Sequence, residues 1–132
     1  MTATQARVDI GIVVRDIDAC LPFYRDVHGL ESRMDIPLPG KSHMWELAWG
    51  PSRVKLITHE PAPEAANPSG GSRGGTGLRY WTMPVDDIEA AVARCEEAGA
   101  PIPLPVIQLV PGVRIAFVED PEGNAIEFLE HK

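Results

Sequence analysis

The stretch Ile115-Ala-Phe-Val-Glu-Asp-Pro-Glu-Gly-Asn-Ala-Ile-Glu127-Phe-Leu-Glu130 decides the fold of this chain. Apolar residues flank Asp-Pro-Glu-Gly-Asn, a composition typical of a tight turn, so the stretch predicts a strand, a turn and a second strand. Alternation places Ala125, Glu127 and Leu129 on one face of the second strand. Glu127 is then a carboxylate among apolar side chains, and a buried carboxylate requires a partner.

A weak internal repeat extends this pattern to the whole chain. Sliding the chain by 71 residues places Val14-Arg-Asp-Ile-Asp-Ala19 on Val85-Asp-Asp-Ile-Glu-Ala90. Each copy is expected to be a strand that runs into a helix, with an aspartate as the helix N-cap. A slide of 72 residues places Lys55 on Glu127, in the last strand of each copy. The sequence therefore predicts two βαβββ modules.

The two modules are expected to form one domain over residues 1–132, because a chain of 132 residues is too short for two independently stable domains. Module one covers about 7–60 and module two about 78–131. The elements expected in them are strands near 7–14, 43–49 and 53–59 with a helix near 17–27 and a further strand around 34–36, then strands near 78–85, 106–110, 113–119 and 124–130 with a helix near 87–98.

Residues 61–77 join the modules and are rich in proline and glycine, which disfavour both helix and sheet. They are expected to be a linker, with a mobile lid over a cavity as the alternative.

Composition limits the partners and the location. The formal net charge is −7, with 12 basic and 19 acidic residues, so neither nucleic acid nor an anionic membrane surface is an expected partner. The N-terminal residues contain no apolar segment and no run approaches about 18 apolar residues, so neither signal peptide nor membrane span is predicted. A cytoplasmic location is the resulting expectation. Cys20 and Cys95 have no motif spacing and are expected to be buried thiols.

The ending, together with Val13-Val-Arg-Asp-Ile-Asp-Ala-Cys-Leu-Pro-Phe-Tyr-Arg-Asp-Val-His-Gly-Leu30, resembles the vicinal oxygen chelate superfamily. That group contains glyoxalase I, methylmalonyl-CoA epimerase, extradiol dioxygenases and bleomycin-resistance proteins. The resemblance implies an α+β fold in which two βαβββ modules form a curved mixed sheet, a glyoxalase-like half-barrel, with helices on the convex face and a cavity on the concave face. It also implies a homodimer.

In metal-dependent members of the family, four strands each send one ligand to a divalent ion, and Asp9, Lys55, Tyr80 and Glu127 stand at those places here. A lysine ammonium has no lone pair to give and repels a cation. The expectation is therefore no cofactor, with Lys55 in place of the metal charge, Glu127 and Asp9 as its counter-ions and Tyr80 hydrogen-bonding among them. One divalent ion on Glu127, Asp9 and His59 is the alternative.

Other residues are candidates for contact with a small-molecule ligand. Trp45 and Trp49 share one face of the strand near 43–49, and they either line the cavity or belong to the core. His59 has the same parity as Lys55 and is expected at the cavity rim. Arg114 is either an inward anion anchor or an exposed side chain.

Two classes of function follow from these candidates. One is a metal-independent lyase or isomerase acting on a small carbonyl-bearing metabolite, with Glu127 or Asp9 as base, Lys55 as electrostatic stabiliser and Tyr80 as hydrogen-bond donor. The other is a non-catalytic protein of the bleomycin-resistance type that binds an antibiotic or secondary metabolite. A metal-dependent glyoxalase or dioxygenase is the third.

Overall fold

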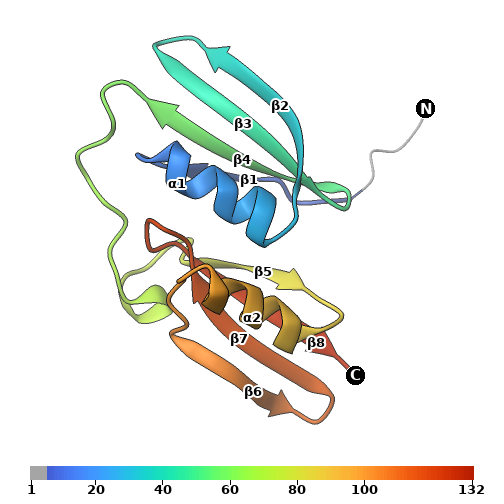
Figure 1. The fold of residues 1–132 in the computed structure, drawn as a ribbon. Helices are drawn as coiled ribbons and strands as arrows, with labels where there is room; N and C mark the ends of the chain where they lie inside the picture. The colour runs from blue at the N-terminus through green and yellow to red at the C-terminus, as the bar shows by residue number, and fades with distance from the viewer. Residues whose placement is uncertain (1–5) are drawn as a thin grey trace. The chain divides into compact units, whose positions relative to one another are not determined.

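The computed structural model describes residues 6–132, which divide into two compact units, the first ending at Glu64 and the second beginning at Ala65 (Figure 1). Each unit contains one four-stranded sheet and one longer helical segment. Among the described residues no helix is long and apolar enough to cross a membrane.

The first unit is the first βαβββ module. Its sheet has the order β1-β4-β3-β2, with β1 parallel to β4 and the remaining neighbours antiparallel. A helical segment joins β1 to β2. The elements are β1 (Ile10–Val13), α1 (Ile17–Pro22) followed by a π-helical turn (Phe23–Val27), β2 (Glu31–Leu38), β3 (Ser42–Trp49) and β4 (Ser52–His59).

The second unit repeats this topology with the order β5-β8-β7-β6, and β5 runs parallel to β8. The predicted α+β class with two βαβββ modules is thereby confirmed, while the joining of both into one curved sheet stays a prediction. The elements are a 3₁₀ turn (Gly71–Arg73), β5 (Tyr80–Pro84), α2 (Ile88–Glu97), β6 (Leu104–Val110), β7 (Val113–Glu119) and β8 (Ala125–His131).

Both helices begin at the predicted aspartates. The Asp16 carboxylate accepts a hydrogen bond from Ala19 N–H at 3.2 Å, and the Asp87 carboxylate accepts one from Ala90 N–H at 3.1 Å. These bonds satisfy amides that have no partner within the first helical turn. The aspartates at equivalent places of the repeat therefore fix where each strand gives way to a helix.

The first helix differs from the uniform helix expected over 17–27. After Pro22 the chain widens into a π-helical turn, in which His28 N–H donates to the carbonyl of Phe23 at 3.1 Å. A proline inside a helix removes one backbone donor, which favours such a local change of hydrogen-bonding pattern.

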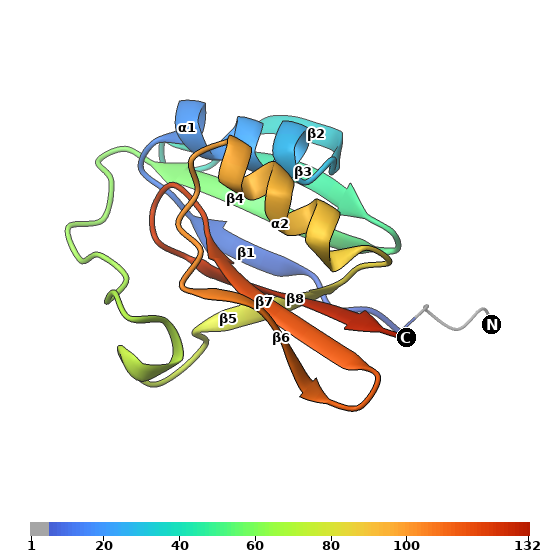
Figure 2. The same ribbon diagram turned by 60° about the horizontal axis from the view of Figure 1, so that its bottom comes forward.

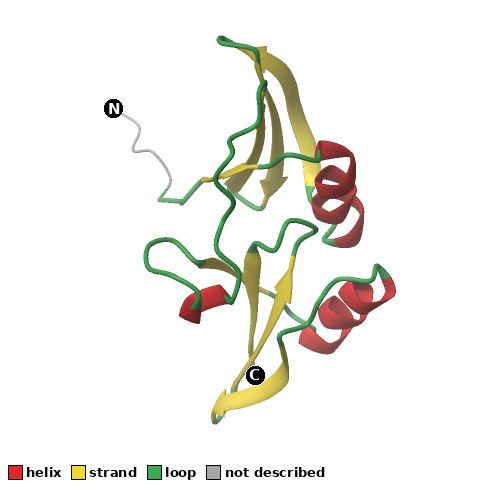
Figure 3. Cartoon of the chain, turned by 90° about the vertical axis from the view of Figure 1, so that its left-hand side faces the viewer, coloured by secondary structure: helices red, strands yellow, loops and turns green. Residues whose placement is uncertain are grey.

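Each helix lies on one face of its own sheet (Figure 3). Helix α1 contacts β4, and α2 contacts β7 and β8 (Figure 2). The first sheet buries Leu47, Val54 and Leu56 on one face, and the second sheet buries Ile126 and Phe128 on one face. Cys20 and Cys95 are both buried free thiols, as expected. We call the side of each sheet that its own helix does not cover the open face of that unit.

The segment expected as a linker over 61–77 is bound to the units at both of its ends. Arg15 donates to the carbonyls of Pro63 and Glu64 at 2.9 and 2.7 Å in the first unit. In the second unit Arg79 donates to acceptors on three residues of the segment, at 2.6 to 2.8 Å; these are the Asn67 side chain and the carbonyls of Pro68 and Gly71.

Candidate functional site

Glu127 lies on the open face of the second unit, where alternation had placed it. Strand pairing sets it directly between Thr82 of β5 and Phe117 of β7. The Thr82 hydroxyl donates a hydrogen bond to Glu127 Oε1 at 2.7 Å. Because only one of the two carboxylate oxygens is used in this bond, the other is available within this unit to accept a proton or a ligand hydrogen bond.

Tyr80 stands one step along β5 from Thr82, opposite Ala125. Its ring packs edge-on against Phe117, with centroids 5.0 Å apart and planes at 81°, and the residue is 44% exposed. Glu127 therefore receives its hydroxyl partner from Thr82, whereas Tyr80 contributes an accessible aromatic surface beside it.

Lys55 lies on the open face of the first unit, directly between Gly11 of β1 and Glu46 of β3. Cross-strand partners in these positions share one face of a sheet. Among the described residues of this unit the Lys55 ammonium forms no ion pair or hydrogen bond, although Glu46 is its direct cross-strand neighbour.

Asp9 shares this open face but has other partners. Its carboxylate accepts the backbone N–H of Arg53 at 2.9 Å and lies 3.3 Å from the Arg7 guanidinium. The expected pairing of Asp9 with Lys55 is therefore absent from the described part of the first unit, because these two arginine groups take the carboxylate instead.

The internal repeat relates the two open faces residue by residue. Gly11 precedes Thr82 by 71 residues and Lys55 precedes Glu127 by 72, the same two slides that relate the modules. In both units the charged residue of the last strand stands beside the equivalent residue of the first strand. That neighbour supplies a hydroxyl in the second unit and has no side chain in the first.

The tryptophans occupy the other side of the first sheet. Trp45 is opposite Leu56, which is fully buried under α1, so Trp45 and Trp49 share the face of β3 that α1 covers. Their position agrees with the interpretation that this face of the strand belongs to the core. It does not agree with the expected contact between the two tryptophans and a ligand. His43 lies on the same face, where its ring is 4.2 Å from that of Trp45 and is hydrogen-bonded to Asp35.

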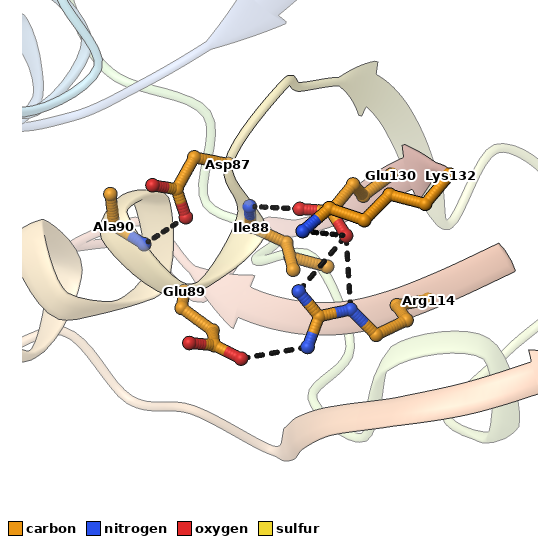
Figure 4. A network of polar contacts seen from close by, with 7 residues as sticks. All are labelled: Asp87, Ile88, Glu89, Ala90, Arg114, Glu130 and Lys132. Atoms are coloured by element: carbon orange, nitrogen blue, oxygen red, sulfur yellow. Dashed lines mark hydrogen bonds and ion pairs between the residues drawn. The ribbon is translucent and has the colours of Figure 1, made fainter. Parts of the chain in front are cut away.

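Arg114 also lies away from the open face of its unit. It pairs across strands with Glu130, whose side chain is buried on the α2 side, and it donates to Glu130 and Glu89 at 2.9 and 2.7 Å (Figure 4). The two carboxylates, Glu89 first and then Glu130, raise the pKa of Arg114 above its ordinary value. Its guanidinium is thus committed to a structural network, and the expected role as an anion anchor beside Glu127 does not fit.

His59 is exposed at the end of β4, where its Nδ1 shares a hydrogen bond of 2.6 Å with the Ser42 hydroxyl. It keeps the parity of Lys55, with Ile57 between them along the strand. Its place at the rim of a cavity stays a prediction.

The residues at the four family ligand positions do not fit a divalent ion. Lys55 offers no lone pair as an ammonium, and Asp9 is engaged by Arg7 and Arg53. Among the described residues no three His, Cys, Asp or Glu side chains gather in a group that could hold an ion. The alternative set of Glu127, Asp9 and His59 draws on both units and remains a prediction.

Three site residues escaped sequence reasoning, namely Thr82, Glu46 and Gly11. Thr82 and Gly11 could have been found, because the slide that aligns the modules also aligns these two positions beside Glu127 and Lys55. Glu46 could not, since its pairing with Lys55 depends on the register set by the turn between β3 and β4.

Known structures with this architecture were found across almost the whole chain. A glyoxalase family protein from Bacillus cereus has a TM-score of 0.84 at 19% identity, with 98% of this chain and 96% of that chain covered. Lactoylglutathione lyase from Agrobacterium tumefaciens has a TM-score of 0.67 at 24% identity, with 98% and 96% covered. The trypanothione-dependent glyoxalase I of Leishmania major has a TM-score of 0.72 at 22% identity, with 96% and 87% covered.

At these identities the structural likeness shows the fold alone. No match was found among curated protein sequences. The family model that describes the Glyoxalase/Bleomycin resistance protein/Dioxygenase superfamily matches residues 6–128. With nearly its whole length matched, and with both βαβββ modules in place, the chain belongs to the Glyoxalase/Bleomycin resistance protein/Dioxygenase superfamily.

Proposed function

We propose that this protein is a metal-independent lyase or isomerase that acts on a small carbonyl-bearing metabolite. The observation that supports this most is the 2.7 Å bond from the Thr82 hydroxyl to Glu127. It fixes one carboxylate oxygen on the open face of the second unit and leaves the other to act as a general base. A base must be oriented before it can take a proton from carbon efficiently.

The proposed step is removal of a proton from the carbon next to the carbonyl group. The proton passes to the Glu127 carboxylate, and the electron pair of the broken C–H bond forms the enolate of the substrate. The enolate oxygen needs a stabilising positive charge, and the sequence assigns this role to Lys55, an ammonium with no partner in the described part of its unit. Return of the proton to the opposite face of a stereogenic carbon gives the epimer of the substrate, and expulsion of a leaving group from the carbon next to the carbanion gives a lyase reaction.

The relatives make this class of reaction a reasonable choice. One structural neighbour is named lactoylglutathione lyase and another glyoxalase I. Their similarity to this chain lies below 25% identity, so the reaction is proposed from the residues of this chain and agrees in type with the names of those neighbours.

Exchange of solvent deuterium tests the proposal without knowledge of the natural substrate. Pyruvate and α-ketoisocaproate are incubated with chelator-treated protein in deuterium oxide, and loss of the proton signal next to the carbonyl is followed by NMR. We expect exchange above the buffer rate with wild type and with Glu97→Gln, a control at an exposed helix position. Glu127→Gln should abolish it. Equal rates for wild type and Glu127→Gln would refute Glu127 as the base.

A binding protein of the bleomycin-resistance type is the second candidate. It is favoured by the edge-on contact of Tyr80 and Phe117, which exposes an aromatic ring beside Glu127. Aromatic faces of this kind suit a flat organic ligand. Under this alternative an aromatic natural product would bind, Tyr80→Ala would weaken its binding, and no deuterium exchange would occur with any carbonyl compound.

A further inference from the structure

Gly11 lies on the open face of the first unit, and nothing in the described part of that unit requires a glycine there. It sits within β1, its φ is not in the left-handed region, and a Cβ built on it would meet no atom within 4 Å. Glycine inside a strand weakens it and often marks a place where a ligand or another backbone comes close. The space is therefore available for something outside this unit.

The neighbour of this space is the Lys55 ammonium, which has no ion pair or hydrogen bond among the described residues of its unit. Lys55 is directly opposite Gly11 in the parallel register of β1 and β4. In the second unit the equivalent neighbour of Glu127 is Thr82, and its hydroxyl fills the corresponding place with a hydrogen bond. In the first unit Lys55 has no side chain beside it on the Gly11 side, and the Glu46 carboxylate lies across from it on the β3 side. An anionic group is the chemical complement of that arrangement.

The next row of side chains on the open face is apolar throughout. One step along the strands from Gly11 and Lys55, the register aligns four apolar side chains across the sheet, namely Val13, Ile57, Met44 and Ile36. Val13 is 48% exposed and Ile36 is 37% exposed. A charged row beside an apolar row matches a molecule with an anionic end and a hydrocarbon end.

We propose that Gly11 and Lys55 form an anion subsite, in which the Lys55 ammonium binds a carboxylate or enolate oxygen and the space above Gly11 admits it. The apolar row binds the hydrocarbon part of the same ligand. The substrate class is then a small carboxylate that carries a carbonyl and an apolar tail. This inference rests on the proposed function for the identity of the oxygen that Lys55 meets, but the subsite binds its ligand whether or not turnover follows.

Binding of α-ketoisocaproate, measured by isothermal titration calorimetry, tests the subsite. Wild type is expected to bind this acid at least about tenfold more tightly than its neutral methyl ester, since only the acid pairs with Lys55. It should also bind the acid more tightly than pyruvate, which lacks the apolar tail.

Three variants separate the parts of the subsite. Lys55→Met should remove the preference for the acid over the ester, whereas Lys41→Met, which removes an exposed cation in the turn between β2 and β3, should keep it. Gly11→Val should weaken binding of acid and ester alike. Circular dichroism melts of each variant establish that it is folded before binding is compared.

The following binding results would overturn the subsite. Wild type that binds the acid no better than the ester, or Lys55→Met that keeps the preference, would show that Lys55 does not meet the anion. Folded Gly11→Val that binds normally but changes its oligomeric state would show that the space receives protein. Tight, Lys55-dependent binding without deuterium exchange would instead leave the subsite in place and refute the catalytic function.

Discussion

Thr82 and Gly11 occupy equivalent positions and have opposite effects on the charged residue beside them. Thr82 holds the Glu127 carboxylate in one orientation, whereas Gly11 leaves the Lys55 ammonium open. The presence or absence of a single side chain therefore separates a positioned base from an exposed cation.

Thr82 is a positioning residue, and its removal should affect the rate more than the binding. Thr82→Val keeps the shape and loses the hydroxyl, and we expect deuterium exchange to fall about tenfold or more, because a hydrogen bond to a charged group contributes roughly 1.5–3 kcal/mol. Thr82→Ser should retain most of the rate. NMR exchange rates and calorimetric affinities check this, and a Thr82→Val variant as fast as wild type would contradict it.

Gly11→Ala should stabilise the fold while it impairs binding. Alanine is favoured over glycine in a strand interior by about 0.5–1 kcal/mol, and the added Cβ meets nothing in this unit. Gly29→Ala is the matched control, because its site is equally empty but its φ of +76° is strained for alanine. Denaturant unfolding should give a higher unfolding free energy for Gly11→Ala and a lower one for Gly29→Ala. Destabilisation by both would mean that the space at Gly11 is filled by protein.

Among the elements, α2 and β8 are joined by a buried carboxylate. Glu130 accepts the Ile88 N–H at the start of α2 at 2.9 Å and the Arg114 guanidinium at 2.9 Å, with Lys132 at 3.8 Å (Figure 4). The hydrogen bond from the Ile88 amide is the largest cause that holds the pKa of Glu130 below its ordinary value of 4.5. Arg114 and then Lys132 lower this pKa further.

A lowered pKa in the folded state makes the stability depend on pH in a defined direction. The contribution of ionised Glu130 to the free energy of unfolding is complete above its ordinary pKa of 4.5. It is lost as the pH falls through the lower pKa that Glu130 has in the folded protein. Thermal melts between neutral pH and strongly acidic pH should therefore show Glu130→Gln several degrees below wild type at neutral pH and converging with it in acid. Glu97→Gln, exposed at the end of α2, should follow wild type throughout. A constant gap between Glu130→Gln and wild type would contradict the linkage.

The loop before β5 is ordered by one side chain, Arg79, through its three acceptors in residues 67–71. Arg79→Met should free this loop, and trypsin should then cleave after the exposed Arg73 about tenfold faster or more. Arg94→Met, on the exposed side of α2, should leave the rate unchanged. Equal cleavage of Arg79→Met and wild type would show that the loop is held by other contacts.

The elements also show which parts of the fold a single sequence can predict. Strands with one buried face, such as β4 and β8, alternate clearly and were located within one or two residues. The strand β2 was expected only around 34–36 but spans Glu31–Leu38, because this edge strand is exposed along nearly its whole length and has a bulge after Ser32. Apolar residues recur at every second position only in its second half, at Met34, Ile36 and Leu38, so the sequence located that part of the strand and missed the first half.

For the molecule as a whole, the repeat explains why fold and site were predictable to different degrees. Duplication of one βαβββ unit fixes the topology twice, and the family match follows from it. Side-chain partners diverged between the copies, so Asp9 pairs with arginine groups and Trp45 faces α1, neither of which alternation alone could determine.

We propose that the Lys55 ammonium takes the place of the metal ion that the family resemblance implies. Mass spectrometry of the native protein, purified without chelator and then incubated in turn with zinc, nickel, manganese, cobalt and iron(II), tests it most directly. We expect no stoichiometric ion with any of these metals. One tightly bound ion per chain, retained through buffer exchange, would contradict it and return a metal-dependent glyoxalase or dioxygenase to first place.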